Sequence, residues 1–518
     1  MKKNQLFILG IVFCMAYMFM SCDEVLDLNP PDRLSSGTFW KTKSDADMAL
    51  AGVYRSLTLD IISAGSGGGT LAHWEGLTDN AFCNYPWEGG FQNLAKVITP
   101  TSGTSLSSLY ENAYRGIAYA NDFLANVDNI SDASFTDDLK KQYKAEAKFI
   151  RVYWYYWLTQ CFSDVPYTDK PLTVETMKMP VTKKADIVTK LLADLDECIA
   201  NLPDITYVES NGHIVKGAAQ ALKARIQLFN GDYSGAAASA KAIIDGGKFS
   251  LNTSGATAYG DLFSGDGGQR SIPEIMFSTR FSYPHYTHRL EMQLNGWSSV
   301  APTPDFAFNY EDGDNRKAQT IAYTGDYFRV GANWGVPTVR PWSGWMVTGM
   351  VINKYSWRTK SNYQNSDDNN EATDVIHIRY AEVLLMYAEA LCQVNNGPDA
   401  SAYSAINQVR NRAGLPDLAP GLSKQQFLDA VLRERRYEFF AEEAMRYMDL
   451  KRYRLAGTLL PKIPYPPIFP NPDGTVPPPT SSTTYMPWDD RWYVWPIPQS
   501  EVDKDPENLQ QVNSSRGY

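Results

Sequence analysis

Helical periodicity in residues 216–251 constrains the fold of this 518-residue chain more than any other feature. Apolar residues recur here at the three- and four-residue spacing of one buried helix face, as at Leu222 and Ile226. Gly231-Asp232-Tyr233 separates two such runs, and Gly246-Gly247 ends the second in the manner of a helix C-terminus. Alanines at the facing positions allow two helices to approach closely. The segment therefore predicts an antiparallel helical hairpin.

The same periodicity recurs in four further segments: 110–127, 137–162, 374–414 and 424–453. The first two predict long helices, the third a second hairpin and the fourth another helical run. Helix pairs repeated on this scale suggest a mainly α fold with a stacked, tetratricopeptide-like scaffold over roughly residues 105–250 and 374–455, although the strict repeat consensus is absent. An ordinary, non-repeating helical domain is the alternative.

Long segments without periodicity lie between the helices, at residues 65–103, 253–271, 283–363 and 461–479. Loops of this length in a compact protein are usually either functional or disordered, and the many aromatic residues in two of them argue against disorder. We therefore expect an irregular binding region over roughly residues 60–103 and 253–363, within one domain that covers residues 22–518.

The N-terminus combines Lys2-Lys3, an apolar run from Leu6 to Met20, and Ser21-Cys22. The run is short for a bilayer and leads directly into polar sequence, so residues 1–21 predict a secretory signal peptide and not a spanning helix. A small residue directly before a cysteine resembles the bacterial lipobox, which implies lipidation of Cys22. A plain cleaved signal and an uncleaved anchor are the alternatives. Acyl chains on Cys22 would tether an otherwise soluble body to a membrane.

Charge and motif content argue against several classes of function. A net charge of −10 without any basic stripe argues against nucleic acid as a partner. The chain has 5 histidines and lacks the Gly-x-Ser-x-Gly, Walker and dinucleotide-binding motifs. We therefore expect no cofactor, no metal and no catalytic residue.

Three patterns have both a chemical and a structural interpretation. Glu75 and Asp79 are spaced like a pair of glycosidase carboxylates, and residues 312–316 are similar to a calcium loop that lacks its later ligands. The four cysteines after residue 22 are widely spaced, which argues against a disulfide framework. We favour the structural interpretation for all three, with free cysteines.

Aromatic residues are the main candidates for function, because the chain contains 13 Trp and 31 Tyr. Sugar recognition needs flat apolar faces with polar groups at their rim. The candidate ligand-binding residues are Trp74, Asp79, Asn84, Tyr85 and Trp87 in the first long loop and Tyr283, Trp297, Trp334, Trp342 and Trp345 in the later one. The alternative is that some of these tryptophans fill the core beneath the loops.

Other tryptophans are expected to be structural. They are Trp40, Trp154 and Trp157, which lie in predicted helices or structural positions, and Trp488, Trp492 and Trp495, which are expected to cap the C-terminal end.

Short motifs follow one another in order along the chain. They include Cys22-Asp23 with Phe39-Trp40, Ala145 to Arg151, Phe162 to Pro166, Gly231-Asp232-Tyr233, Ile378 to Ala390, Ile406 to Leu415, Glu434-Arg435-Arg436-Tyr437-Glu438, Asp449 to Arg452, and Trp495 to Pro498. In this order, and over essentially the whole mature chain, they resemble the SusD/RagB family of nutrient-binding outer-membrane lipoproteins of Bacteroidetes. The charged residues within them, such as Arg379 and Glu438, are expected to form ion pairs between helices and not to act in catalysis.

The resemblance implies a SusD-like fold, a lipid anchor on the outer face of the outer membrane, and a SusC-like TonB-dependent transporter as partner. It implies a non-catalytic role in capturing an oligosaccharide and delivering it to that transporter. The alternatives are the same role for a peptide or another nutrient, a surface glycoside hydrolase, and a helical scaffold that binds no small ligand. The resemblance assigns no binding residue, because the irregular segments vary with the ligand.

Overall fold

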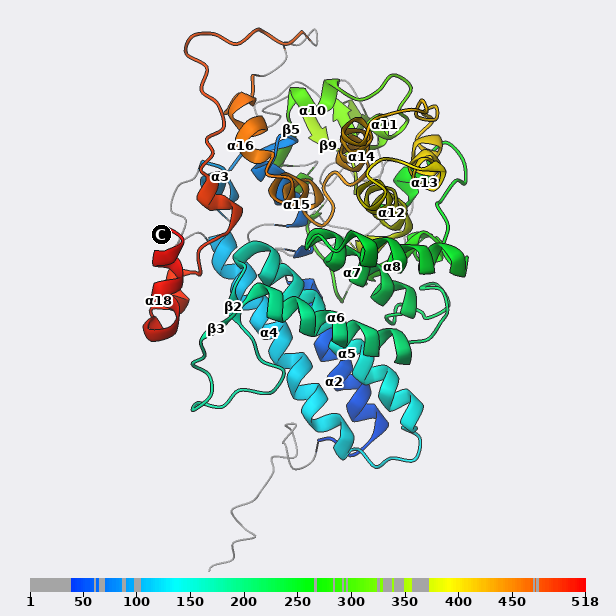
Figure 1. The fold of residues 1–518 in the computed structure, drawn as a ribbon, viewed down its shortest axis with the longest axis vertical. Coiled ribbons are helices and arrows are strands. Elements are labelled where there is room, and N and C mark those ends of the chain that lie inside the picture. Colours follow the sequence, from blue (N-terminus) through cyan, green and yellow to red (C-terminus); the bar gives the residue numbers. More distant parts are fainter. Residues whose placement is uncertain are drawn as a thin grey trace, which may run out of the picture.

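The computed structural model describes residues 39–59, 62–64, 70–85, 90–96, 104–264, 268–282, 285–290, 293–294, 297–323, 327–328, 338–339, 349–355, 372–468, 471 and 475–518. Residues 1–21, Cys22 and the candidate residues Trp87, Tyr283, Trp334, Trp342 and Trp345 lie outside these ranges. The described part is mainly helical, as predicted (Figure 1).

The long helices form one continuous stack. Their bounds are α2 Lys43–Arg55, α4 Thr104–Asn126, α5 Asp137–Phe162, α6 Lys184–Asn201, α7 Lys216–Phe229, α8 Tyr233–Gly246, α12 Tyr380–Val394, α13 Ala400–Arg412 and α14 Lys424–Glu438. From α4 to α8 each helix packs on the next. The stack then continues across a long gap in the sequence, because α8 packs on α12, which contacts α13 and α14 (Figure 1). The two predicted helical regions therefore join through α8 and α12.

The α7–α8 hairpin forms for the reasons that the sequence suggested. Gly231 adopts a positive φ of 82° in the turn, and the carboxylate of Asp232 caps α8 by accepting a hydrogen bond from the Gly235 N–H at 2.9 Å. Gly247 then ends α8 in the left-handed conformation. Buried Ala236 and Ala240 lie on α8. The prediction of a hairpin is confirmed.

Two of the predicted helical segments differ from the structure. Residues Val375–Arg379 form a strand, β10, and the helix begins only at Tyr380. The run 424–453 is interrupted between α14 and the helix α15, Met445–Arg452, where Ala441, Glu443 and Ala444 have positive φ angles of 58°, 48° and 53°. Helical periodicity also exists in α2 and α6, which the sequence analysis did not single out.

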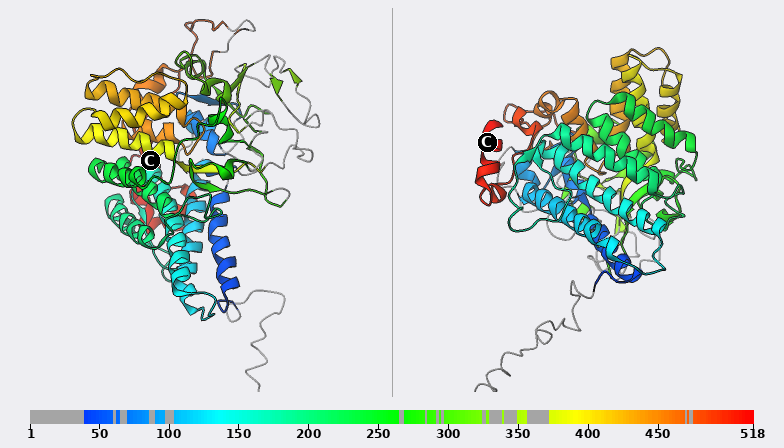
Figure 2. Two further views of the ribbon diagram at one scale, coloured as in Figure 1. Left: turned by 90° about the vertical axis from the view of Figure 1, so that its right-hand side faces the viewer. Right: turned by 60° about the horizontal axis from the view of Figure 1, so that its bottom comes forward.

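The strands form two-stranded antiparallel ribbons. They pair as β1 Ala81–Cys83 with β5 Val300–Pro302, β4 Ile275–Thr279 with β10, β2 Val165–Pro166 with β3 Val181–Thr182, β6 Ile321–Tyr323 with β9 Met350–Ile352, and β7 Tyr327–Phe328 with β8 Thr338–Val339. Apart from the short β2–β3 pair, the ribbons lie on the side of the molecule away from α6 and α8 (Figure 2). The predicted irregular binding region is therefore partly strand.

Short helices complete the described part. They are η2 Ser56–Thr58, η4 Leu71–Leu77, α3 Phe91–Ala95, η5 Val127–Asn129, α9 Ala258–Asp261, η6 Gly268–Ser271, α10 Pro304–Phe308, α11 Arg316–Thr320, α16 Ala456–Leu459, η9 Leu460–Lys462, η10 Asp490–Tyr493, α17 Gln499–Val502 and α18 Pro506–Ser515. Within the described ranges, no helix is both long and apolar enough to cross a membrane. In the described part of the chain, Cys83, Cys161, Cys198 and Cys392 are buried and form no disulfide bond, as expected.

Ion pairs occupy the interior where the helical stack meets the ribbons. The Arg379 guanidinium contacts the carboxylates of Glu274, Glu438 and Glu442, and all four side chains are buried. Arg435 pairs with Asp449 at 2.8 Å. These contacts confirm the structural interpretation of the charged motif residues. They connect β10 to the end of α14 and to the break that follows it, and α14 to α15, so they fix register across these elements.

Candidate functional site

The two long loops that carry the candidate residues meet at the β1–β5 ribbon. The strands pair with Cys83 opposite Val300, and the backbone continues this pairing because the Asn84 N–H donates to the Ser299 carbonyl at 2.9 Å. The chain beyond the paired strands then carries Tyr85 on one side and Trp297 on the other. The structure therefore brings together three of the predicted residues: Asn84, Tyr85 and Trp297.

Tyr85 and Trp297 form an aromatic surface at the end of this ribbon. The Tyr85 hydroxyl donates a hydrogen bond to the Trp297 carbonyl at 3.0 Å, so the two residues are held side by side. Trp297 remains 39% exposed, which is unusual for a residue of this size. We call Asn84, Tyr85 and Trp297 the Tyr85–Trp297 surface. Its exposed part includes the flat apolar face of an indole.

Polar groups support this surface from below. The Asn84 side-chain amide donates to the Ser298 carbonyl, and Gln92 from α3 donates to the Cys83 carbonyl at 2.9 Å. Ser298 has a positive φ of 54°, a strained conformation for a residue with a side chain, and such strain is concentrated at functional sites. The Asn84 Oδ1, Ser298 Oγ and Gln293 Oε1 atoms are buried without a hydrogen-bond partner. These three atoms lie beneath the surface and are shielded from solvent, so they add to the strain of this turn.

The prediction that Trp74 contacts ligand is wrong in this structure. Trp74 lies in η4, is 0% exposed, and stacks on Trp495 with ring centroids 5.2 Å apart and planes inclined by 2°. Trp157 and Tyr447 pack on its other sides, at 5.3 and 5.5 Å. No face of the indole is open to a ligand. The alternative interpretation, that loop tryptophans fill the core, holds for this residue.

Asp79 is also a structural residue. Its carboxylate receives two hydrogen bonds from Arg446, at 2.8 and 2.7 Å, and lies 3.3 Å from Arg436. Burial alone would raise the pKa of Asp79, but the guanidiniums of Arg436 and Arg446 lower it to about 2. Only 4% of Asp79 is exposed, so it is not available to a ligand, which corrects its assignment.

Glu75, the second member of the possible glycosidase pair, also has structural hydrogen-bond partners. It is 1% exposed, and its carboxylate accepts hydrogen bonds from the Ala441 N–H and from Asn80, both at 2.8 Å. Burial raises the pKa of Glu75. With Asp79 in an ion pair, the two carboxylates have structural partners and do not face an open cleft. Asp314, in the strip that is similar to a calcium loop, likewise pairs with Arg316 at 2.7 Å.

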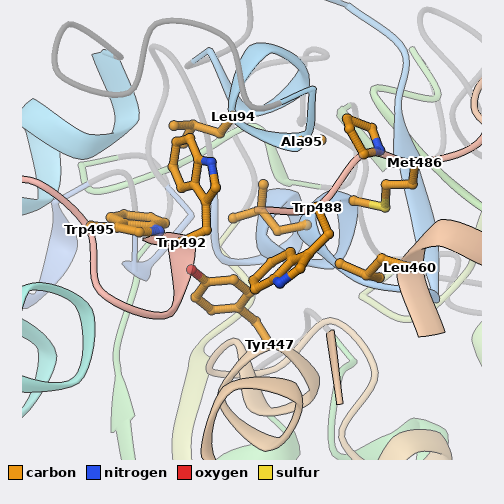
Figure 3. Close-up of a pocket in the computed structure, with 10 residues that line it drawn as sticks. Leu94, Ala95, Tyr447, Leu460, Met486, Trp488, Trp492 and Trp495 are labelled. Atoms are coloured by element: carbon orange, nitrogen blue, oxygen red, sulfur yellow. The ribbon is translucent and has the colours of Figure 1, made fainter. Parts of the chain in front are cut away.

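An aromatic concavity lies where the C-terminal segment covers η4 and α15. Trp488, Trp492, Trp495 and Tyr447 line it together with Leu94 and Met486 (Figure 3). The space open to a water-sized sphere is about 20 Å³, which is room for about one water molecule and far too small for a sugar ring. Trp492 and Trp495 are buried. These residues cap the C-terminal end, as the sequence analysis expected.

Ser298 and Gln293 are the residues of this region that the sequence analysis missed. Neither stands in a motif, and a pair of serines after a tryptophan carries no local signal for a strained turn. Within the described ranges, no group of three His, Cys, Asp or Glu side chains is placed to hold a metal ion.

The chain is similar to known proteins along most of its length. The sequence model of the SusD family matches residues 275–518, and a second model, described as starch-binding associating with outer membrane, matches residues 74–228. SusD-like protein P38 of Formosa agariphila is 27% identical over 476 residues, which cover 83% of this chain and 88% of the relative.

Solved structures share the fold. A SusD-like carbohydrate-binding protein from Bacteroides fragilis superimposes with a TM-score of 0.75 at 25% identity, covering 91% of this chain and 100% of the other. A laminarin-binding SusD-like protein gives a TM-score of 0.70 at 22% identity, with coverage of 90% and 98%. Two family models that match different parts of the chain, relatives along most of its length and the shared helical architecture agree. The chain belongs to the SusD/RagB family.

Proposed function

We propose that this protein captures an oligosaccharide on the Tyr85–Trp297 surface and releases it without breaking a bond. The observation that carries the proposal is the hydrogen bond from the Tyr85 hydroxyl to the backbone carbonyl of Trp297, a residue whose side chain is among the exposed large hydrophobic ones at 39%. The two aromatic residues supply apolar contact, and the Tyr85 hydroxyl, whose hydrogen bond to Trp297 is exposed, supplies a polar group at their edge. The likeness to a family that includes a carbohydrate-binding protein and a laminarin-binding protein supports a glycan as the ligand.

The proposal includes the site of action. Lipid on Cys22 would hold the protein on the outer face of the outer membrane, where it would deliver the glycan to a SusC-like TonB-dependent transporter. Support comes from the resemblance of residues around Cys22 to a lipobox and from the family model described as associating with the outer membrane. Stable anchoring of this kind requires more than one acyl chain, because a single chain binds a bilayer only marginally.

A glycan panel tests binding and catalysis together. The soluble chain that starts after Cys22 is titrated with starch-type, β-glucan and other oligosaccharides by calorimetry, and the same mixtures are followed over time for products. Heat of binding with intact glycan supports the proposal. Release of cleavage products would contradict it. Binding of peptides without binding of any glycan would show that the ligand is a peptide.

Substitutions then place the site. Tyr85→Phe keeps the ring but removes the hydroxyl that donates to the Trp297 backbone carbonyl. Tyr85→Ala removes the ring as well. We expect a small loss of affinity for the first and a large loss for the second. Tyr485→Ala is the matched control, because Tyr485 is 44% exposed on the proline-rich C-terminal segment. Equal affinities for all three variants would exclude this surface as the binding site.

A further inference from the structure

A cleft of about 580 Å³ lies between α2, η2 and α4, away from the β1–β5 ribbon. It continues into a second hollow of about 300 Å³, because Arg55, Thr58 and Tyr286 line both. Helix α2 lies at the edge of the helical stack (Figure 2). A concavity of this size falls within the range of roughly 300–1,000 Å³ that small-ligand sites occupy.

The floor of this α2–α4 cleft is made of small side chains. Ala49, Gly52 and Ser56 follow one another on one face of α2 and its continuation into η2, and all three line the cleft. A Cβ atom built on Gly52 would meet no other atom within 4 Å. A glycine inside a helix costs stability compared with alanine, and packing does not explain this one. The missing side chain at residue 52 deepens the cleft.

Aromatic rings form the walls. Tyr119 on α4 is 46% exposed, and Trp40 packs edge-on against Phe123 with its ring centroid 5.9 Å away. Trp40 also has a positive φ of 68°, a strained conformation that the surrounding contacts maintain. Tyr286 is held in place because its hydroxyl lies 2.6 Å from the Thr58 hydroxyl. The walls therefore offer several fixed rings, one of them widely exposed.

Two arginines in this cleft have no acidic partner among the residues that the structure describes. Arg55 and Arg115 are exposed and line the cleft, and neither guanidinium has an ion pair or a hydrogen bond to a described residue. Asp122 is the only acidic residue among the described lining, and it already accepts a hydrogen bond from Asn126 at 3.2 Å. By contrast, Arg225, Arg316 and Arg379 in the interior are all paired with carboxylates. The whole chain has a net charge of −10, so Arg55 and Arg115 make this cleft a positive region on an acidic protein.

We propose that the α2–α4 cleft is a second binding site, for the acidic residue of a uronate- or sulfate-bearing oligosaccharide. A guanidinium matches the two oxygens of a carboxylate or sulfate in a bidentate arrangement. The Tyr119 and Trp40 rings cover the apolar face of the sugar. The choice of a saccharide over another anion rests on the glycan-binding function proposed above, whereas the anionic character follows from Arg55 and Arg115 alone.

Calorimetry with defined probes tests this site. The probes are tetragalacturonic acid, its methyl ester, a sulfated chondroitin hexasaccharide, maltohexaose and a glutamate-rich peptide. We expect the wild-type protein to bind at least one of the two acidic saccharides, the methyl ester to bind much more weakly than the free acid, and the affinity for acid to fall as salt rises.

Variants of the cleft separate this site from the Tyr85–Trp297 surface. Gly52→Leu fills the cleft, and Arg55→Gln with Arg115→Gln removes its charge. Each arginine lost should weaken acid binding by about tenfold or more, since a hydrogen bond to a charged group is strong. Met48→Ala is the control, because Met48 is 49% exposed on α2 and does not line the cleft, and it should bind as the wild type does. Trp297→Ala should leave acid binding in the cleft unchanged.

The outcomes distinguish the two proposals. The inference is overturned if neither acidic saccharide binds, if Gly52→Leu binds them as the wild type does, or if Trp297→Ala abolishes their binding. It is also overturned if the glutamate-rich peptide binds through Arg55 and Arg115 while no saccharide does, because the site would then serve a protein partner. Wild-type affinity of Trp297→Ala for a neutral glycan, together with loss of acid binding in the cleft variants only, would overturn the Tyr85–Trp297 proposal alone.

Discussion

The indole of Trp74 lies parallel to that of Trp495, with 5.2 Å between the ring centroids. This stack joins the first long loop to the C-terminal segment, across most of the length of the chain. It fixes η4, and β1 follows η4 directly and leads to Asn84 and Tyr85. A buried aromatic pair thus positions the strand that leads to the half-buried Tyr85 and its exposed neighbour Trp297.

Removal of this stack should destabilise the protein without changing its specificity. We expect Trp74→Ala to lower the free energy of unfolding by about 3–5 kcal/mol, because a large buried ring leaves a cavity. Urea denaturation followed by tryptophan fluorescence and circular dichroism measures the effect. Trp297→Ala is the control, since an exposed substitution should change the unfolding free energy by no more than about 0.5 kcal/mol. Similar losses for the two variants would contradict the assignment of Trp74 to the core.

The ion pair of Asp79 with Arg446 predicts that the free energy of unfolding decreases at low pH. Burial raises the pKa of Asp79, but Arg436 and Arg446 bring it down to about 2, below its value in an unfolded chain. The contribution of Asp79 is therefore complete above about pH 4 and is lost as the pH falls toward 2. It amounts to roughly 2 kcal/mol by the size of the shift.

Unfolding midpoints measured between pH 7 and pH 2 check this contribution. Asp79→Asn should be less stable than the wild type at pH 7, and the difference should shrink below pH 4. Asp245→Asn serves as the control, because Asp245 pairs with Lys241 at 2.6 Å on the exposed surface of α8. A constant difference between Asp79→Asn and the wild type at every pH would contradict the prediction.

Gly52 offers a test of the α2–α4 cleft that does not depend on any ligand. We expect Gly52→Ala to raise the free energy of unfolding by roughly 0.5–1 kcal/mol, since alanine is favoured within a helix and its Cβ meets no atom here. Thermal denaturation of the two proteins gives the comparison. A destabilised Gly52→Ala variant would show that the space above Gly52 is occupied by the protein itself.

Anchoring through Cys22 is tested in cells. The wild-type protein should sediment with the outer membrane and carry acyl chains that mass spectrometry detects, whereas Cys22→Ala should lose both the acyl chains and membrane association. Cys83→Ala, which replaces a buried thiol, controls for general effects of cysteine loss. Equal membrane association of Cys22→Ala and wild type would contradict the lipid anchor.

The helical part of the fold could be predicted from sequence because its signals are local. In α7 and α8 the buried positions, the capping Asp232 and the terminating Gly247 lie within a few residues of the helices that they define. The break after α14 has no such local signal. Glu442 and Glu443 leave the helical path to reach Arg379, Lys354 and Arg225, which come from distant parts of the chain.

The candidate site shows the same limit. Trp74 and Trp297 both stand in aromatic, polar-rich loops, and nothing near either residue tells a buried indole from an exposed one. Trp495 covers the first from the opposite end of the chain, whereas the strained turn at Ser298 leaves the second 39% exposed. Asn84, Tyr85 and Trp297 could be identified as candidates, but only the β1–β5 pairing brings them together.

The most direct test of the account is the calorimetric affinity of Trp297→Ala for a neutral oligosaccharide that the wild-type protein binds. At roughly 25 cal/mol per Å² of apolar surface removed from water, covering the exposed part of one aromatic ring contributes on the order of 1–2 kcal/mol. We therefore predict at least about a tenfold loss of affinity, with unchanged unfolding by urea and no cleavage of the glycan. Wild-type affinity in Trp297→Ala, or release of shorter products, would contradict the claim that the Tyr85–Trp297 surface captures glycan without catalysis.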